Sequence, residues 1–417
     1  MALHITASQP DPELLALPWD RPLEEWEGPY IADLPRGISR HVVRFVKVSG
    51  RVLAVKEIRE ELARAEYQLL KALRRQGRPC VKAFGVVSGR ERADGEPLDA
   101  CLVTRHLRFS MPFRAVFSQR MRPDTANRLL DALAVLLVKL HLGGFWWGDV
   151  SLSNALFRRD AGAFSAYLVD AETGQLVPSL TPGQRSHDLE IARVNIAGEL
   201  MDLAALGVLD KDLDPIVVSE RVITRYTQLW EELTGVERVG LGERWRIDER
   251  IRRLNTLGFD VDELSMSTEP DTTSIQIQPK VVDAGHHSRR LMRLTGLDVQ
   301  ENQARRLLND LDRYAAEHGR ADESEELVAH EWMSRVYEPV VSNIPPDLSA
   351  KLEPAELFHE VLEHRWFMSE REGQDVTTLW AFVDYLNTVL PAKRDEEAIV
   401  GVDTVEMPVI AMFADGP

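Results

Sequence analysis

From about residue 30 the chain is rich in β-branched residues, a pattern typical of β-strands, before a helical period begins. Two β-branched runs flank Ser49-Gly50, which is the pattern of a β-hairpin. Apolar residues then recur at helical spacing until Gly77-Arg78-Pro79 ends the helix. The expected elements are strands over residues 42–48, 52–56, 81–87 and 102–107 and a helix over residues 57–75. Residues 30–107 therefore predict a small α+β lobe.

The residues on either side of this lobe have different patterns. Prolines interrupt residues 1–29, which predict a loose N-terminal arm with a short helix, its Trp19 and Trp26 docked on the body. Residues 108–237 are mainly helical in period, and a leucine-rich core helix ends at Gly143-Gly144. The expected elements are helices over residues 125–142, 188–206 and 217–233, a strand and turn over 157–162, and a returning strand over 166–169. A second, mostly helical lobe follows from this pattern.

The remaining chain predicts a further helical region. Residues 238–280 read as a charged connecting segment whose polar end, residues 265–279, forms a strand or a linker. Residues 281–390 predict a helical domain, and residues 391–417 predict a partly disordered tail. The expected helices cover residues 298–317, 323–338, 353–370 and 375–389.

Composition narrows the functional classes. The net charge of −17 argues against nucleic-acid binding, which relies on clustered Lys and Arg. No apolar run reaches the roughly 18–20 residues of a membrane span, and the first residues lack a secretion pattern, so we expect a cytoplasmic protein. The two cysteines, Cys80 and Cys101, read as free thiols.

Three oxygen-bearing side chains are the strongest chemical signal. Asp149 and Asn154 lie five residues apart on a predicted loop after the core helix, and Asp170 ends the returning strand. Phosphoryl transfer needs a carboxylate that orients the attacking hydroxyl, together with oxygen ligands that hold Mg²⁺ against nucleotide phosphates. The alternative for Asp149 alone is a loop aspartate that caps a turn.

A lysine and a glutamate upstream support the same chemistry. Lys56 ends a strand of otherwise apolar residues, and Glu66 lies on the apolar face of the next helix. Because a buried carboxylate is costly unless it is paired, we expect Glu66 to pair with Lys56 and hold it toward phosphates. Glu60 and Glu61 are competing partners.

This order of strand lysine, helix glutamate, long helix, Asp-x4-Asn loop, strand and aspartate resembles the protein-kinase-like fold. The small-molecule and lipopolysaccharide-kinase branches are most similar, because Gly148-Asp149 replaces the Arg-Asp of protein kinases. Over its whole length the chain also resembles an actinobacterial family with a domain of unknown function and a kinase-like N-terminal half. The implied fold is a two-lobed α+β kinase-like fold followed by a mostly helical C-terminal region.

The resemblance implies a role for each matching residue. Asp149 corresponds to the catalytic base, Lys56 and Glu66 to the phosphate-positioning pair, and Asn154 and Asp170 to the metal ligands. ATP and Mg²⁺ are the implied cofactors. Residues 105–107 (Arg105, His106 and Leu107) fall where the hinge between the lobes meets adenine. Gly37 and Ser39 are all that remains of the glycine-rich phosphate loop, and a plain turn between strands is the alternative for them.

Several departures from the protein-kinase pattern matter. Trp147 stands where the family commonly has His, and Ser151 stands where protein kinases carry a phosphate-contacting Lys. Ala171-Glu172 follows Asp170 in place of Phe-Gly, and Glu172 is either a further metal ligand or a solvated loop residue. Asp188 either caps the next helix or braces the catalytic loop, as the corresponding aspartate of the family does. Of these, Ser151 and Ala171-Glu172 point away from protein substrates, and Trp147 favours a pseudokinase.

The helical region carries two further candidate features. One is a local basic cluster whose members are Lys280, His286, His287, Arg289 and Arg290. This cluster predicts either an anion site for a phosphate-bearing substrate or the solvent-exposed start of a helix. Apolar residues over 355–367 read as packing between helices or as a surface for a protein partner or a second copy of the chain. The sequence therefore predicts a phosphotransferase with a small-molecule hydroxyl acceptor, with a nucleotide-binding pseudokinase scaffold as the alternative.

Overall fold

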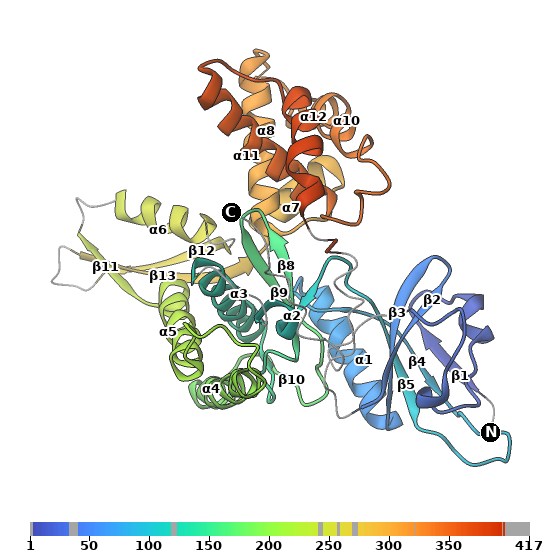
Figure 1. The fold of residues 1–417 in the computed structure, drawn as a ribbon. Helices are drawn as coiled ribbons and strands as arrows, with labels where there is room; N and C mark the ends of the chain where they lie inside the picture. Colours follow the sequence, from blue (N-terminus) through green and yellow to red (C-terminus); the bar gives the residue numbers. More distant parts are fainter. Residues whose placement is uncertain are drawn as a thin grey trace.

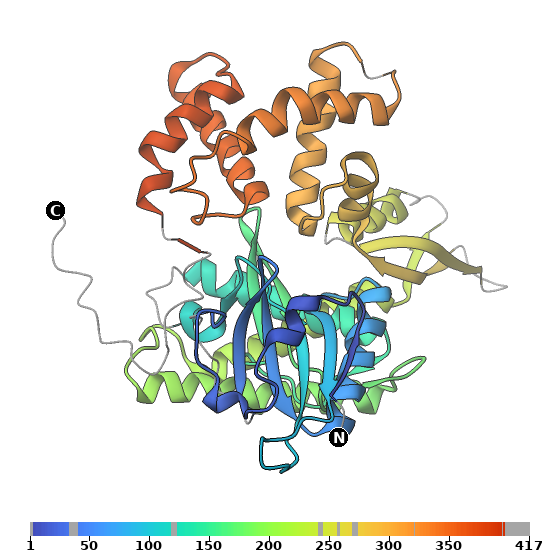
Figure 2. The ribbon, with the colours of Figure 1, turned by 90° about the vertical axis from the view of Figure 1, so that its right-hand side faces the viewer.

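The computed structural model describes residues 3–32, 41–117, 123–240, 245–256, 259–268, 274–320, 322–393 and 395–396. Two kinase-like lobes are followed by a mostly helical C-terminal region, as the sequence predicts (Figures 1 and 2). Gly37, Ser39 and tail residues 397–417 lie outside the described residues. No helix within the described ranges has both the length and the apolar character that a membrane crossing requires.

The first lobe is an antiparallel five-stranded sheet in the order β1-β4-β5-β3-β2, with helix α1 packed on one face. Ser49 and Gly50 both adopt positive φ angles, 47° and 69°, which closes the β2–β3 hairpin with a tight turn. Its elements are β1 His4–Ala7, β2 Val43–Val48, β3 Arg51–Ile58, α1 Glu60–Arg75, β4 Lys82–Ser88 and β5 Ala100–Arg105.

The prediction of a loose N-terminal arm over residues 1–29 is wrong for the first residues of the chain. Strand β1 pairs with β4 at the edge of the sheet, so these residues belong to the lobe. After β1, two short 3₁₀ turns, Pro12–Ala16 and Leu23–Glu25, carry the chain over the outer face of the sheet. Trp19 and Trp26 are buried there against apolar side chains of β2, β3 and β5, as predicted. The prolines break up helices, but they do not prevent a short edge strand.

The second lobe is built around the apolar helix α3, which packs on the β8–β9 hairpin and on α5. Helix α4 begins at Pro182, before the predicted start, because Thr181 and Gln184 form a capping box. The elements of this lobe are β6 Met111–Pro112, α2 Phe113–Phe117, α3 Pro123–Leu142, β7 Phe145–Trp146, β8 Ala155–Asp160, β9 Ala163–Leu168, β10 Gln175–Leu176, α4 Pro182–Ala205 and α5 Pro215–Thr234.

The predicted connecting segment is more regular than expected. It forms a three-stranded sheet in the order β11-β13-β12, and its polar end forms much of strand β13. The elements are β11 Glu237–Gly240, α6 Trp245–Thr256, β12 Phe259–Thr268 and β13 Ser274–Ala284.

The helical region has its own apolar core, and most of the apolar residues over 355–367 face that core. Trp366 and Phe367 are the exceptions, because more than half of each side chain is exposed. The elements are α7 His286–Thr295, α8 Glu301–Glu317, α9 Glu325–Trp332, a π-helical turn Met333–Tyr337, α10 Glu338–Val341, α11 Pro354–Glu372, α12 Thr378–Thr388 and a 3₁₀ turn Leu390–Ala392. Both views show the β8–β9 hairpin pointing from the second lobe toward these helices (Figures 1 and 2).

Candidate active site

Lys56 lies at the centre of a group of charged side chains between the lobes. It belongs to β3, an inner strand, where it pairs with Val43 and Leu102. Side chains alternate along a strand, so Lys56 faces the side of the sheet opposite to the buried Leu53 and Val55. Its Nζ atom therefore points toward α1 and the segment that follows β9.

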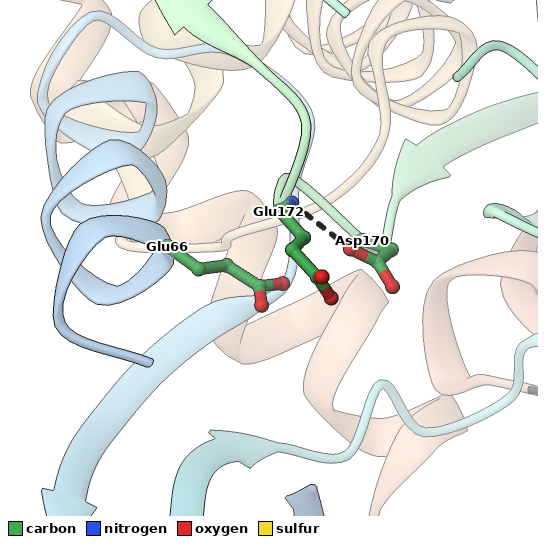
Figure 3. Close-up of side chains that lie close together, drawn as sticks. All are labelled: Glu66, Asp170 and Glu172. Atoms are coloured by element: carbon green, nitrogen blue, oxygen red, sulfur yellow. Dashed lines mark hydrogen bonds between the residues drawn. The ribbon is translucent and has the colours of Figure 1, made fainter. Parts of the chain in front are cut away.

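Three carboxylates contact this lysine. Its Nζ lies 3.0 Å from Glu66 Oε2, 2.9 Å from Asp170 Oδ2 and 3.2 Å from Glu172 Oε2. One oxygen of each carboxylate lies within 4.8 Å of an oxygen of each of the other two. Figure 3 shows the three side chains converging from α1 and from the segment after β9, where the Glu172 N–H donates to Asp170 Oδ1 at 2.9 Å. We call these four residues the lysine cluster.

The predicted pairing of Lys56 with Glu66 is present in the structure. Glu66 is 1% exposed and lies on the buried face of α1. Its Oε1 accepts a hydrogen bond from the Ala171 N–H at 3.2 Å, which ties the helix to the Asp170 segment. Of the competing partners, Glu60 pairs with Arg64 at the surface, and Glu61 is exposed.

Burial and charge act in opposite directions on this pair. Burial raises the pKa of Glu66 to about 7, and nearby Asp170 adds to the increase, whereas Lys56 opposes it. Burial lowers the pKa of Lys56, but attraction by Glu66 and Asp170 outweighs that effect and raises it overall. Lys56 is therefore charged, while three acidic groups compete for it.

The lysine cluster fits a divalent cation in addition to the lysine. Among the described side chains, three carboxylates around one ammonium leave negative charge in excess, and Glu172 also contacts His41 at 2.9 Å. Carboxylate oxygens are hard ligands of the kind that Mg²⁺ prefers. Glu172, which the sequence left open, thus lies inside the cluster.

Asp149 and Asn154 lie together on the loop before β8. The Asn154 Nδ2 atom donates to the Asp149 backbone oxygen at 3.0 Å and to its Oδ2 at 3.3 Å. Asn195 Nδ2 donates to Asp149 Oδ1 at 3.2 Å. Amide donors on both oxygens fix the orientation of this carboxylate.

The β8–β9 hairpin connects this loop with the lysine cluster. The Asn154 backbone oxygen accepts a hydrogen bond from the Val169 N–H at 3.0 Å, which continues the pairing of Ala155 with Leu168. Asn154 and Asp170 therefore stand at the same open end of the hairpin. This register brings together two residues that lie 16 positions apart in the sequence.

Helix α4 holds the backbone of the loop. Asp188 is fully buried and accepts hydrogen bonds from the N–H groups of Trp147 and Gly148, both at 2.8 Å. It lies inside the helix, whose N-cap is Thr181, so the capping alternative for Asp188 is wrong and its contacts match those of a brace. Trp147, which stands in place of the usual His, is fully buried beside it.

Sequence reasoning missed two polar residues of α4 that contact the same loop. Asn195 holds Asp149, and Glu199 accepts from the N–H groups of Leu152 at 2.7 Å and Ser153 at 2.9 Å. Asn195 and Glu199 follow Asp188 by seven and eleven residues, and this spacing places all three residues on one face of a helix. All three residues lie inside the helix predicted over residues 188–206, so the sequence already contains this signal.

The predicted hinge lies at the end of β5. The His106 N–H donates to the Val52 backbone oxygen at 3.0 Å, and its ring packs edge-on against Phe45 with the centroids 5.5 Å apart. Burial, with help from Arg108, lowers the pKa of His106 to about 4, so this ring is neutral. Arg105, the last residue of β5, is exposed and Leu107 is half-buried.

Two residues of the basic cluster, His287 and Arg290, contact carboxylates within the helical region. His287 Nδ1 lies 2.8 Å from Glu301 Oε1, and Arg290 lies 3.1 Å from Glu325 Oε1. His286 and Arg289 also begin α7, and Lys280 lies in β13. These ion pairs with α8 and α9 give the predicted anion site no support.

Two family models match separate parts of the chain. Residues 46–196 match the model of the lipopolysaccharide kinase (Kdo/WaaP) family. The N-terminal half is kinase-like. Residues 228–390 match the model of a domain of unknown function, DUF4032. The resemblance to both families is thus confirmed, each over its own part of the chain.

A solved structure titled "WaaP in complex with acyl carrier protein" is 19% identical to the chain. The alignment with that structure covers 61% of this chain and 99% of the other chain, with a TM-score of 0.36. The comparison with curated proteins found no significant match.

Proposed function

We propose that the protein transfers the γ-phosphoryl group of ATP, with Mg²⁺, to a hydroxyl group of a small non-protein molecule such as a sugar. The lysine cluster supports this proposal most directly, because Lys56 meets Glu66, Asp170 and Glu172 inside the region that matches the lipopolysaccharide kinase model. A buried ammonium with excess carboxylate around it suits a site that takes a nucleotide together with a cation.

Each residue of the cluster has a distinct role in the proposal. Glu66 holds Lys56 in place, and Lys56 offers its charge to the nucleotide phosphates. Asn154, Asp170 and Glu172 would hold Mg²⁺, which would supply positive charge at the phosphates. The backbone at residues 105–107 would meet adenine.

Asp149 acts as the base in the proposed reaction. Its carboxylate, oriented by Asn154 and Asn195, accepts the proton of the acceptor hydroxyl. The hydroxyl oxygen forms a bond to the γ-phosphorus, the bond from that phosphorus to the β–γ bridging oxygen breaks, and ADP leaves with the electron pair. Asp188 and Glu199 keep the loop backbone, and with it Asp149, in position.

The acceptor is proposed to be small because the protein-kinase features around the loop are absent. Ser151 occupies the place of the phosphate-contacting lysine, and its hydroxyl accepts a hydrogen bond from the Asn154 N–H at 3.2 Å. Glu172 follows the metal-binding aspartate and contacts Lys56. Both residues serve the loop and the cluster rather than a peptide.

The substitution Asp149→Asn tests the proposal. It keeps the shape of the side chain but removes the base, so turnover should fall about a thousandfold. ATP binding, measured by thermal shift, should stay within about twofold, because no phosphate-binding group is changed. The measurement is ADP release in Mg²⁺ with a panel of sugars as acceptors, and the exposed Asp202→Asn in α4 is the matched control. Equal turnover in the wild type and Asp149→Asn would refute the role of Asp149.

One observation favours a second candidate, a nucleotide-binding regulatory scaffold. Lys56 already contacts three carboxylates, so its charge is engaged before any phosphate arrives. A scaffold would bind ATP with the same affinity with and without Mg²⁺ and would release no ADP with any acceptor. An enzyme would show tighter binding in Mg²⁺ together with ADP release.

A further inference from the structure

The turn of the β8–β9 hairpin lies in contact with the C-terminal helical region. Asp160, the last residue of β8, is 1% exposed. Its Oδ1 accepts a hydrogen bond from the Gln303 N–H at 2.8 Å, and its Oδ2 accepts from Asn302 Nδ2 at 3.1 Å and Ser165 Oγ at 2.8 Å. The start of α8 therefore binds the end of β8 through a buried carboxylate whose oxygens both have donors.

A second helix holds the turn from another direction. Glu356 of α11 accepts at Oε2 from the Ala161 N–H at 2.8 Å and from Gln303 Nε2 at 2.9 Å. Gln303 Nε2 also donates to the Arg159 backbone oxygen at 3.2 Å. Gln303 is fully buried and Glu356 is 2% exposed, so water does not compete for these bonds.

The turn itself has a backbone conformation that needs support. Ala161 has a φ of 50° and Gly162 a φ of 81°, both in the left-handed region. Glycine adopts this region readily, whereas alanine rarely does. The only side chain that bonds the Ala161 N–H among the described contacts is Glu356, which thus fixes the strained residue.

Ion pairs on the same hairpin add to this contact. Arg158 pairs with Glu353, the residue before α11, and Arg159 pairs with Glu396 near the end of the described chain. The Glu396 N–H also bonds the Lys351 backbone oxygen at 3.2 Å, so the first part of the expected tail is attached. The residues that bind the hairpin come from several parts of the helical region.

The hairpin connects this contact to the candidate active site. Its pairing runs without a register shift from Asp160↔Ala163 to Ala155↔Leu168. Asn154 precedes this ladder and Asp170 follows it by two residues, at the end opposite to the turn. At about 3.3 Å per residue, the six residues of β8 span roughly 20 Å. A held turn and an unbroken ladder restrict where the two proposed metal ligands can move.

The two family matches meet at this contact. The hairpin belongs to the segment that matches the kinase model, and Gln303 and Glu356 belong to the segment that matches DUF4032. Simple packing between neighbouring domains would be served by apolar side chains, which pack without strict geometry. Directed bonds from two helices to one turn instead fix its position.

We infer that the helical region positions Asn154 and Asp170 for phosphotransfer by holding the β8–β9 turn, with Gln303 and Glu356 as the positioning residues. The inference rests on the proposed function for its catalytic consequence, but the effect on the hairpin is independent of turnover. Without the helical contact, the hairpin moves, Mg²⁺ is bound less well, and the nucleotide contacts of Lys56 and the hinge are unaffected.

The test compares Glu356→Ala, which removes the acceptor for the Ala161 N–H, with Glu356→Gln, which keeps one. In Glu356→Ala, amides of residues 155–172 should exchange hydrogen about tenfold faster than in the wild type. The Mg²⁺ concentration that gives half of the ATP-dependent thermal shift should rise about tenfold, and kcat should fall by a similar factor. The thermal shift with ATP alone should not change. Glu356→Gln should stay within about twofold on each measurement.

Glu370→Ala is the matched control, because Glu370 is an exposed glutamate of the same helix. Gln303→Ala provides a second variant if Glu356→Ala does not fold, and it should show the same pattern more weakly. Wild-type exchange rates in residues 155–172 of a folded variant would overturn the inference, whatever the turnover. A wild-type protein without turnover would refute the proposed function alone, since faster exchange in Glu356→Ala would still support the positioning role.

Discussion

Two carboxylates in this protein are buried to the same extent but have very different partners. Glu66 lies in the lysine cluster, and Asp160 lies at the β8–β9 turn; each is 1% exposed. Burial raises the pKa of both, to about 7 for Glu66 and about 6 for Asp160. Burial alone therefore does not separate a functional acidic group from a structural one.

The partners make the difference. Asp160 accepts hydrogen bonds from an amide N–H, an amide side chain and a hydroxyl, all neutral donors. Glu66 instead shares one lysine with Asp170 and Glu172, which leaves negative charge in excess. Saturated neutral hydrogen bonds are typical of a fixed contact, whereas excess like charge is stable only if a cation or another ligand balances it. We expect mutations to distinguish the two regions accordingly.

Removing the cation of the lysine cluster should have the largest effect on turnover. Lys56→Met keeps the length of the side chain but leaves three carboxylates without the ammonium, so kcat should fall about a thousandfold. The variant should also lose tight ATP binding, because the carboxylates then repel phosphates. Steady-state ADP release and ATP thermal shift measure both effects. Lys47→Met, an exposed lysine on neighbouring β2, is the control, and equal losses in the two variants would argue against a special role for Lys56.

Neutralising Glu66 should have an intermediate effect. Glu66→Gln keeps the hydrogen bond from the Ala171 N–H but weakens the hold on Lys56, so turnover should fall about 10- to 100-fold. ADP release is again the measurement. Glu61→Gln on the exposed face of α1 is the matched control. Full activity of Glu66→Gln would show that Asp170 and Glu172 hold the lysine without it.

The same substitution predicts a change in the pH dependence of stability. The pKa of Glu66 rises from 4.5 in the unfolded chain to about 7 in the folded protein, so the folded protein binds more protons between these values. Its contribution to stability is complete below pH 4.5 and is lost as the pH rises through about 7, by roughly 2–3 kcal/mol. Gln does not titrate. Urea unfolding of both proteins at pH 5 and pH 8 should show a loss that is larger in the wild type by this amount, and parallel curves would contradict the pKa shift.

Much of the lysine cluster could be predicted because its signals are local. The turn at Ser49-Gly50 and the strand that ends at Lys56 lie within a short segment, and the helical period places Glu66 on a buried face. The predicted loop and strand end suggested that Asn154 and Asp170 meet, and the resemblance to a family then implied their role as metal ligands. The hairpin register that joins them in the structure needs only a short turn.

The β8–β9 turn could not be predicted in the same way. Gln303 and Glu356 lie more than 140 residues beyond Asp160, and nothing in their local sequence marks a contact partner. Strand β1 was missed for a related reason, since four residues become a strand only because β4 offers an open edge.

The early start of α4 was missed for a different reason. Thr181-Pro182-Gly183-Gln184 contains a capping box, but Pro-Gly is also a common turn signal, so the local sequence does not separate a helix start from a loop.

The smallest effect on turnover is expected for Asp160→Asn, which tests the structural side of the comparison. Asn keeps an oxygen that can accept from the Gln303 N–H. At the other position the Ser165 hydroxyl can reverse its bond, and the Asn302 side chain can turn its amide oxygen toward the new amide. The turn should therefore stay in place, and kcat should remain within about twofold of the wild type.

The pH dependence of stability should nevertheless differ between the wild type and this variant. Burial raises the pKa of Asp160 from 3.8 to about 6, while the bonds from Gln303 and Ser165 limit the rise. The folded wild type binds the extra proton between these values, so its stability falls, relative to Asp160→Asn, by roughly 2–3 kcal/mol as the pH rises from 4 to 7. Urea unfolding at pH 4.5 and pH 7 measures this difference. A large loss of turnover in Asp160→Asn without a change in exchange over residues 155–172 would place the charge of Asp160 in the reaction itself, and the distinction between a charged site and a neutral contact would then fail.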